Sequence, residues 1–302
     1  MRLLDSAVVR VLPAVPRSVV RRVAAPYIAG PTLDDARRVV RILNGEGMGA
    51  TVDVLGEEIG RPEEAEAMAR AYHDALAAIA SDDLEANISI KLTGFGLKLD
   101  ERLCRDLVRA VVADAAERGI FVRIDMEDTS TTDDTLALYR ALRADGHDGL
   151  GIVLQAALRR TLDDIAALAA LEPSVRLCKG IYVEPAAVAH QSFEAVRSSF
   201  VACLDALLET GGRIAIATHD EWLLERALER VGGLERDRYE MQMLLGVRAD
   251  RARELVADGH PLRIYVPYGE RWYEYSLRRL QENPKVAGYV AKDLLGRLVP
   301  GR

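Results

Sequence analysis

The strongest constraint on the fold is a repeated pattern of a short β-rich run followed by a longer amphipathic segment. The amphipathic segments, such as 63–80 and 100–119, are rich in Ala and Leu and have helical periodicity. Strand-then-helix units of this kind build parallel sheets through right-handed crossovers, and eight of them predict an α/β fold, the (β/α)8 TIM-type barrel. The eight runs lie at 51–56, 87–92, 121–126, 151–156, 175–180, 213–218, 239–244 and 262–267.

The run at 239–244, YEMQML, is the weakest of these strand predictions, because Met and Glu suit a helix equally well. An open doubly wound sheet is the main alternative fold, but it usually carries G-x-G-x-x-G after a strand. The sequence Gly94-Phe95-Gly96 lacks the third glycine. No linker or low-complexity tract interrupts the chain, so we expect a catalytic barrel at 46–302, preceded by an N-terminal helical segment, 1–45, that packs on it.

Composition excludes several classes of protein. The 302 residues are 49% apolar, which favours a large core, and their formal charge of −7 argues against a nucleic-acid binder. Three widely spaced cysteines suggest neither a disulfide framework nor a zinc site, so we expect no metal and a reducing, cytoplasmic location.

The N-terminal stretch 1–26 superficially resembles a signal peptide, but charged residues interrupt its apolar runs. No apolar run in the chain reaches the ~18–20 residues of a membrane span. We interpret this stretch as a basic helix or arm. It either packs on the domain or contacts a partner or a membrane surface.

In a barrel of this type the chemistry lies at the carboxyl ends of the strands. Each polar residue there has a simpler structural explanation when taken alone: Gln155 could bond a loop, and His219 could be a structural histidine. Together they indicate an enzyme site. The polar residues in or just after the predicted strands are Lys91, Asp125, Gln155, Arg176, Lys179, Thr218, His219, Gln242 and Tyr265.

Lys91 and Lys179 stand out because the chain has only five lysines among 40 basic residues. A buried lysine is costly unless it meets an anion, and it offers a compact charge or an amine nucleophile that arginine lacks. The alternative is that each lysine forms a salt bridge across the barrel mouth.

The segment 271–284 reads as a helix that ends near Pro284. Tyr275, Arg278, Arg279 and Glu282 share one face of this helix, at i, i+3, i+4 and i+7. Two guanidinium groups beside a tyrosine suit a small carboxylate. A solvated face with i,i+4 ion pairs from Arg278 to its glutamate neighbours explains the pattern equally well. Spacing alone therefore supports a barrel enzyme with a cationic pocket and names no reaction.

The sequence resembles the bacterial monofunctional proline dehydrogenases, which are flavoenzymes built on a distorted (β/α)8 barrel with extra N-terminal helices. The similarity runs from about Gly30 to Leu294. The most specific block is IYVPYGERWYEYSLRRLQENP, and matching blocks in the family's order are TLDDARRVVRILNGEGMGATVDVLGE, SIKLTGFG, VRIDMED, IVLQAALRRT, VRLCKGIYVEP and IAIATHD.

The resemblance implies roles for individual residues. Arg278, Arg279 and Lys91 would bind the proline carboxylate, and Tyr265 and Tyr275 would wall the pyrrolidine ring. Asp125 would organise the charged groups, with Arg176 close to the flavin N5; these two are the implied catalytic residues. The implied FAD contacts are Met126, Gln155, Lys179, Gly180, Ile181, Thr218, His219 and Glu282.

The implied reaction is oxidation of L-proline to Δ1-pyrroline-5-carboxylate by hydride transfer to FAD. A cation near the flavin N1–C2=O or N5 would stabilise the reduced flavin; either Arg176 or Lys179 could supply that charge. The family passes its electrons to a membrane quinone, which implies peripheral membrane contact.

Three residues depart from the family's pattern: Ala157 and Leu245 stand where a tyrosine is expected, and Val183 stands where larger or charged residues are common. Hydroxyproline or another cyclic imino acid therefore stays open as the preferred substrate. Two other classes also stay open. One is a Schiff-base lyase or aldolase that uses Lys91 or Lys179 as its nucleophile. The other is a non-catalytic binder of flavin or an amino acid.

Overall fold

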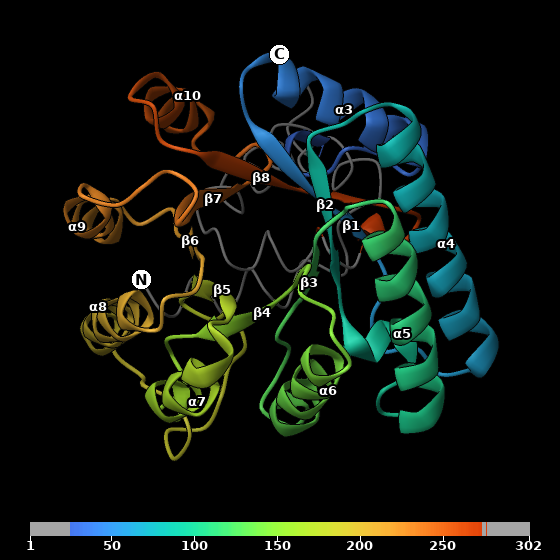
Figure 1. Cartoon of the computed structure of the whole chain (residues 1–302), viewed down its shortest axis with the longest axis horizontal. Helices are drawn as coiled ribbons and strands as arrows, with labels where there is room; N and C mark the ends of the chain where they lie inside the picture. The colour runs from blue at the N-terminus through green and yellow to red at the C-terminus, as the bar shows by residue number, and fades with distance from the viewer. Residues whose placement is uncertain (1–24, 274–275, 277–302) are drawn as a thin grey trace, which may run out of the picture.

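Eight parallel strands close into a barrel in chain order, with β8 pairing back onto β1 (Figure 1). The structure, a computed structural model, describes residues 25–273 and 276. The predicted barrel is confirmed, including the strand at 239–244. The strands are β1 (Gly49–Val54), β2 (Ala86–Ile90), β3 (Val122–Ile124), β4 (Leu150–Gln155), β5 (Ser174–Cys178), β6 (Ile214–Ala217), β7 (Tyr239–Leu244) and β8 (Leu262–Tyr268).

Helices surround the barrel, one in each connection between consecutive strands (Figure 1). Another helix, α3 (Leu33–Gly45), precedes β1, and short 3-10 turns occur at Ala25–Tyr27, Leu92–Phe95 and Ala169–Leu171. The connecting helices are α4 (Pro62–Ser81), α5 (Glu101–Glu117), α6 (Thr132–Ala144), α7 (Thr161–Leu168), α8 (Phe193–Glu209), α9 (Glu221–Val231) and α10 (Ala249–Ala257).

Local sequence signals fix where several helices begin. Thr32 and Asp35 form a reciprocal capping box at α3, and Pro62 occupies the first turn of α4. The side chains of Asp100 and Ser192 accept backbone N–H bonds at the starts of α5 and α8. These signals mark the first turns of four of the helices that cover the barrel.

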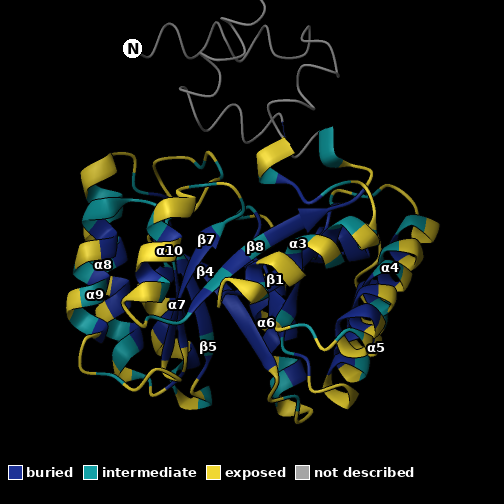
Figure 2. Cartoon of the chain, turned by 90° about the horizontal axis from the view of Figure 1, so that it is seen from above, coloured by how far each residue is buried: buried dark blue, intermediate teal, exposed yellow. Residues whose placement is uncertain are grey.

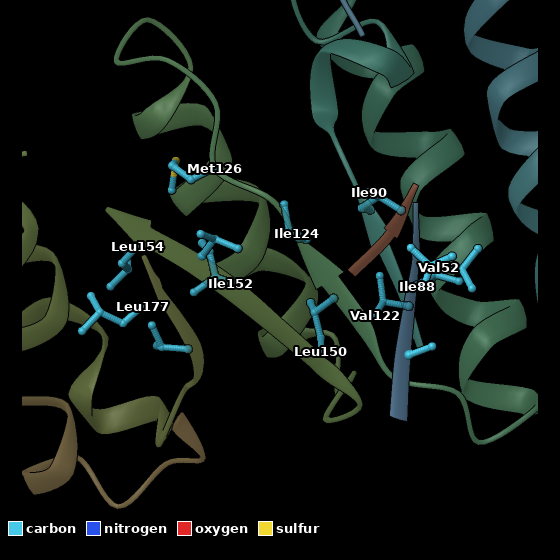
Figure 3. Close-up of a cluster of buried hydrophobic side chains, with 14 of the residues drawn as sticks. Val52, Ile88, Ile90, Val122, Ile124, Met126, Leu150, Ile152, Leu154 and Leu177 are labelled. Carbon is cyan, nitrogen blue, oxygen red and sulfur yellow. The ribbon is translucent and has the colours of Figure 1, made fainter. Parts of the chain in front are cut away.

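The outward faces of the strands form the main apolar core. Val52, Ile88 and Val122 lie at paired positions on β1, β2 and β3, and Figure 3 shows them within a larger set of buried apolar side chains. Successive side chains on a strand point to opposite faces, so this set faces the helices. Figure 2 shows the strands buried, with the exposed residues on the outer surfaces of the helices and in the loops.

The inward faces of the same strands carry polar side chains. Asp53 and Ser89 lie beside Val52 and Ile88 and so point into the barrel, where both are fully buried. Ser89 contacts Arg176 of β5, a strand that does not neighbour β2. Barrels of this type usually fill their interior with branched apolar residues. Here a charged, hydrogen-bonded interior replaces that packing.

Helix α3 packs against β1 and β8. Residues 1–24, which include most of the predicted N-terminal segment 1–45, lie outside the described residues, so the division at residue 45 stays a prediction. Among the residues that the structure describes, no helix combines the length and apolar character needed to cross a membrane.

Candidate active site at the carboxyl end of the barrel

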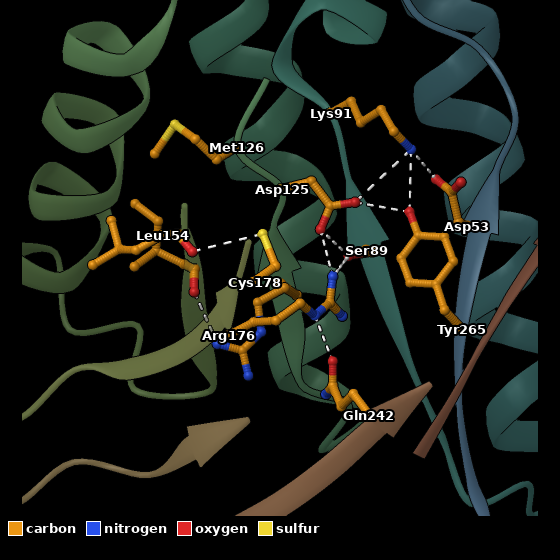
Figure 4. Close-up of polar contacts among 12 residues, drawn as sticks. Asp53, Ser89, Lys91, Asp125, Met126, Leu154, Arg176, Cys178, Gln242 and Tyr265 are labelled. Atoms are coloured by element: carbon orange, nitrogen blue, oxygen red, sulfur yellow. Dashed lines mark hydrogen bonds and ion pairs between the residues drawn. The ribbon is translucent and has the colours of Figure 1, made fainter. Parts of the chain in front are cut away.

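Four of the predicted site residues meet in one buried cluster (Figure 4). Lys91 and Asp125 directly follow β2 and β3, whereas Arg176 and Tyr265 point inward from β5 and β8. They come from strands far apart in the sequence, and the closed barrel brings them together.

Asp125 is the centre of this cluster. One carboxylate oxygen, Oδ1, accepts hydrogen bonds from Ser89 Oγ (2.6 Å) and Arg176 Nη1 (2.7 Å). The other, Oδ2, accepts from the Tyr265 hydroxyl (2.7 Å) and lies 3.8 Å from Lys91 Nζ. Burial raises the pKa of Asp125, but the positive charges of Arg176 and Lys91 outweigh burial and hold it below its usual range. Asp125 is therefore an ionised carboxylate.

Lys91 forms ion pairs, as the salt-bridge alternative predicted. Its Nζ donates to Asp53 Oδ1 (2.7 Å) and to the Tyr265 hydroxyl (3.2 Å). Burial lowers the pKa of Lys91, but Asp53 and Asp125 outweigh burial and raise it above its usual range. A Schiff-base nucleophile needs a lysine with a depressed pKa. The Lys91 ammonium is therefore suited to holding an anion and poorly suited to that rival reaction.

Asp53, which sequence analysis did not single out, completes the cluster. It is fully buried on β1, and its Oδ2 has no hydrogen-bond partner among residues 25–273. Burial raises the pKa of Asp53, and the nearby Asp125 charge raises it further, while Lys91 opposes both effects. The sequence feature that could have identified Asp53 is a single carboxylate inside the apolar run TVDV, but such a run is typical of an ordinary buried strand.

Arg176 keeps one donor group unused. Its Nε donates to Gln242 Oε1 (2.5 Å), and its Nη1 bonds Asp125 and Ser89, whereas its buried Nη2 has no partner among the described residues. The guanidinium carbon lies 5.3 Å from the centre of the Tyr265 ring. Burying an arginine donor without a partner is costly, so Nη2 is available for a bound anion or cofactor oxygen.

Among the described residues predicted to bind FAD, Met126 lies just after β3 and the others lie at the ends of β4, β5 and β6. Gln155, the last residue of β4, donates its amide to the backbone carbonyls of Met126 (3.3 Å) and Glu127 (3.2 Å). Thr218 accepts a bond from the Asp220 backbone at the end of β6. His219 Nε2 accepts from the Leu244 backbone N–H (2.9 Å), which places its ring beside β7.

Lys179, Gly180 and Ile181 form the turn that leaves β5. Lys179 Nζ lies 3.5 Å from Asp220 Oδ2, so this lysine also forms an ion pair and stands apart from the Asp125 cluster. Gly180 has a φ of +96°, and a Cβ there would lie 3.2 Å from Gln155 Cβ. Ile181 is 45% exposed. The turn thus needs glycine both for its backbone conformation and for its close approach to β4.

Four predicted residues lie outside the described residues, so their places in the site stay predictions: Tyr275, Arg278, Arg279 and Glu282. Of the three departures from the family's pattern, Val183 is fully exposed and Leu245 packs against the core. Ala157 lies in the turn after β4, where its backbone N–H bonds the Lys179 carbonyl.

Sequence analysis also missed two buried glutamates. Glu127 holds the Thr93 hydroxyl and backbone N–H, which ties the end of β3 to the turn after β2. Glu240 lies inside the barrel on β7 and pairs with Arg263 and Arg213. No group of three or more His, Cys, Asp or Glu within the described part of the chain is arranged to hold a metal ion.

Comparisons with known proteins give a consistent result. The family profile described as "Proline dehydrogenase" matches residues 36–292. The chain is 37% identical to proline dehydrogenase 1 of Bacillus subtilis subsp. natto over 274 residues, and 34% identical to the Deinococcus radiodurans proline dehydrogenase over 278 residues. Each alignment covers 90% of both chains.

Among solved structures, the fold is similar to proline utilization A (PutA) from Bdellovibrio bacteriovorus inactivated by N-propargylglycine. The TM-score is 0.80 at 25% identity, and the match covers 86% of this chain. It covers 32% of the PutA chain, so this protein corresponds to about a third of that longer one.

Proposed function

Because the chain belongs to the proline dehydrogenase family, we propose that it oxidises L-proline to Δ1-pyrroline-5-carboxylate with bound FAD as the hydride acceptor. Proline oxidation, the first step of proline catabolism, follows directly from that membership. The cofactor, the residue roles and the final electron acceptor are the parts that we propose.

The observation that carries the proposal is the buried cation–carboxylate cluster around Asp125. Substrate and cofactor must meet at a site where charge is held in place before they arrive, since reorganising charge during the reaction is costly. Asp125 fixes Arg176 on one side and Lys91 and Tyr265 on the other. The cluster therefore holds two cations, Lys91 and Arg176, in fixed positions, one for the substrate and one for the cofactor.

We assign the substrate side of the cluster to Lys91. Its ammonium lies at the end of β2, 14% exposed, and suits the proline carboxylate together with Arg278 and Arg279. Tyr265, which bonds both Lys91 and Asp125, presents its ring as one wall for the pyrrolidine, and Tyr275 supplies another. Holding the carboxylate and the ring at two separate points fixes which ring carbon faces the acceptor.

We assign the cofactor side to Arg176 and to the turns after β4, β5 and β6. The donors present fit FAD, since the buried Nη2 of Arg176 lacks a partner in the part of the chain that the structure describes and Gly180 carries no side chain. FAD, when bound, supplies the two-electron acceptor. Arg176 contributes a fixed positive charge, Lys179 a second one, and Gln155 a carboxamide held by two backbone carbonyls.

The test is the visible spectrum of the purified protein before and after anaerobic addition of L-proline. We expect a flavin band that bleaches with proline. A yellow protein that proline does not bleach would overturn the substrate assignment. A colourless protein that stays inactive after FAD is supplied would overturn the cofactor assignment and favour a lysine-dependent lyase.

A variant pair tests the proposed carboxylate clamp. Arg278→Ala should raise the proline concentration needed for half-maximal bleaching. Arg271→Ala is the matched control in the same segment, because its guanidinium already bonds Glu64 and the Glu57 carbonyl. The same assay with hydroxyproline and with a six-membered imino acid ranks the substrates.

We further propose a membrane quinone as the final acceptor, reached through peripheral contact by the basic segment 1–24. A soluble quinone analogue should reoxidise the proline-reduced flavin faster than dioxygen does. Co-sedimentation with anionic lipid vesicles should weaken when this segment is deleted, and binding that is unchanged by the deletion would reject that segment as the contact.

A further inference from the structure

The guanidinium of Arg176 is held from two sides of the barrel. On one side its Nη1 bonds Asp125 and Ser89, next to the substrate-facing residues. On the other side its Nε donates to Gln242 Oε1 at 2.5 Å, from β7 (Figure 4). The first anchor belongs to the site already described. The second anchor, Gln242, has no role in the proposed chemistry and is 5% exposed.

Glu240 fixes the orientation of the Gln242 carboxamide. The two residues are two apart on β7, so both point into the barrel, and Gln242 Nε2 donates to Glu240 Oε1. Burial raises the pKa of Glu240, but Arg263 and Arg213 outweigh burial and lower it. An ionised carboxylate only accepts hydrogen bonds, so Gln242 must turn its nitrogen towards Glu240 and its oxygen towards Arg176.

The anchor extends to the wall of the barrel. Arg263 Nε lies 3.1 Å and Arg213 Nη2 3.0 Å from Glu240 Oε2, and Arg263 Nη1 also bonds the Ala50 carbonyl on β1. Glu240 is therefore held by Arg263 of β8 on one side of β7 and by Arg213, which directly precedes β6, on the other, and cannot rotate freely. Because Glu240 is fixed, the Gln242 carboxamide that it bonds is also held in one position.

We propose that Gln242 is a positioning residue that sets the place of the Arg176 charge against the bound cofactor, with Glu240 fixing the carboxamide that holds it. The inference rests on the proposed binding of FAD. With Nε and Nη1 both occupied, the guanidinium plane is defined and Nη2 is the donor left for the cofactor. A cation in a fixed place stabilises the additional negative charge of reduced flavin more than one that must reorganise.

The test is the midpoint potential of the bound flavin in Gln242→Met, measured by reductive titration with dithionite and a reference dye, without proline. Met fills a similar volume but accepts no such bond from Arg176. We expect the reduced flavin to be disfavoured about tenfold, which is about 30 mV more negative for a two-electron couple. Thr51→Val is the matched control, because it removes an inward hydroxyl that has no partner in the described structure. Its potential should equal that of the wild type.

A second background separates an effect through Arg176 from a direct effect on the flavin. In Arg176→Met, adding Gln242→Met should shift the potential no further. An equal shift in both backgrounds would mean that Gln242 acts on the flavin directly. No shift in either background would mean that Gln242 does not influence the flavin potential. Both results overturn the proposal.

Glu240→Gln provides a variant that keeps the volume of the anchor. A neutral carboxamide can donate as well as accept, so it no longer dictates which way Gln242 faces. We expect a shift in the same direction as for Gln242→Met, but smaller. An unchanged potential in a folded Glu240→Gln protein would remove Glu240 from the proposal.

These titrations do not use proline, so they stand apart from the test of the proposed function. A wild-type flavin that proline fails to bleach, combined with the expected shift in Gln242→Met, would overturn the substrate assignment and support the positioning role. A protein that binds no flavin after reconstitution overturns both.

Discussion

Asp53 shows how much a single buried charge depends on its neighbours. It is completely buried. Within the described residues, one of its oxygens has no partner and Lys91 is its only ion-pair partner. Removing one member of a buried pair costs about 3–5 kcal/mol, because it strands the other charge. Lys91 therefore has two functions in this structure, a proposed one towards substrate and a structural one towards Asp53.

Lys91→Met should lower the free energy of unfolding by about 3–5 kcal/mol near neutral pH. Loss of the Lys91 charge raises the pKa of Asp53 further above its unfolded value of about 3.9. A raised carboxyl pKa gives stability that is present below the unfolded value and lost as pH rises through the folded one. The deficit should thus be smaller at pH 5 than at pH 8, as measured by urea unfolding.

Lys98→Met is the control for this prediction, since Lys98 pairs with Glu58 and Asp128 at the surface. Its cost should be about 0–1 kcal/mol. A Lys91→Met deficit that does not change with pH would show that Asp53 is not the stranded charge.

Tyr265→Phe should lower kcat/KM for proline by about 10- to 100-fold. The change removes the hydroxyl that donates to Asp125 and accepts from Lys91, and hydrogen bonds to charged groups contribute about 1.5–3 kcal/mol. Steady-state kinetics with proline measures the effect. Tyr268→Phe is the control, three residues along β8 and so on its opposite face. Equal losses in the two variants would contradict a specific role for the Tyr265 hydroxyl.

For single residues, the sequence predicted Lys91, Asp125, Arg176 and Tyr265 as site residues, and the structure brings these four side chains together. Lys91 could be singled out because lysine is rare in this chain, in which arginine is the usual cation. Asp53 and Ser89 were missed, since a single polar residue inside a strand run does not reveal which partner it meets. That information depends on which strands lie opposite each other across the barrel.

Strand β7 shows that the repeated strand–helix pattern predicts where a strand lies but not which partners its inward side chains meet. YEMQML has little intrinsic strand preference, yet it forms a six-residue strand between β6 and β8. Its place in the repeated strand–helix pattern predicted it correctly. The paired inward roles of Glu240 and Gln242 could not be predicted in the same way, because they depend on arginines from other parts of the barrel.

The turn after β5 is the element most sensitive to one added methyl group. Gly180 has a left-handed backbone, and its Cβ would lie 3.2 Å from Gln155 Cβ and 3.3 Å from Ala157 Cβ. Gly180→Ala should therefore lower the free energy of unfolding by about 1 kcal/mol or more and lower the FAD content of the purified protein.

Absorbance at the flavin band relative to protein, together with denaturant unfolding, measures both effects. Gly149→Ala is the control, since Gly149 precedes β4 in open space. Full FAD occupancy in Gly180→Ala would exclude this turn from the cofactor site.

Across the whole molecule, buried carboxylates control the response to acid. Burial raises the pKa values of Asp125 and Glu240, but nearby positive charges outweigh burial and hold both values below their usual range. The charges are Arg176 and Lys91 for Asp125, and Arg263 and Arg213 for Glu240. Such groups give stability that is present above the unfolded pKa of about 4 and lost as pH falls through the folded pKa. Asp53 and Glu127, whose pKa values burial raises, act in the opposite sense.

We therefore expect a thermal midpoint that changes little between pH 8 and pH 5 and falls below pH 4, as measured by calorimetry. Asp125→Asn should show a shallower fall in acid than the wild type. A midpoint that stays constant down to pH 3 would contradict this assignment of charges.

The two faces of each strand have consequences for how such a protein can change over generations. What holds the barrel closed is the apolar outward face under the helices, whereas the inward face carries the chemistry. Substitutions that redirect the reaction can therefore accumulate on one side of a strand while selection for folding acts on the other. A lineage with this architecture is free to acquire a new substrate long before it acquires a new fold.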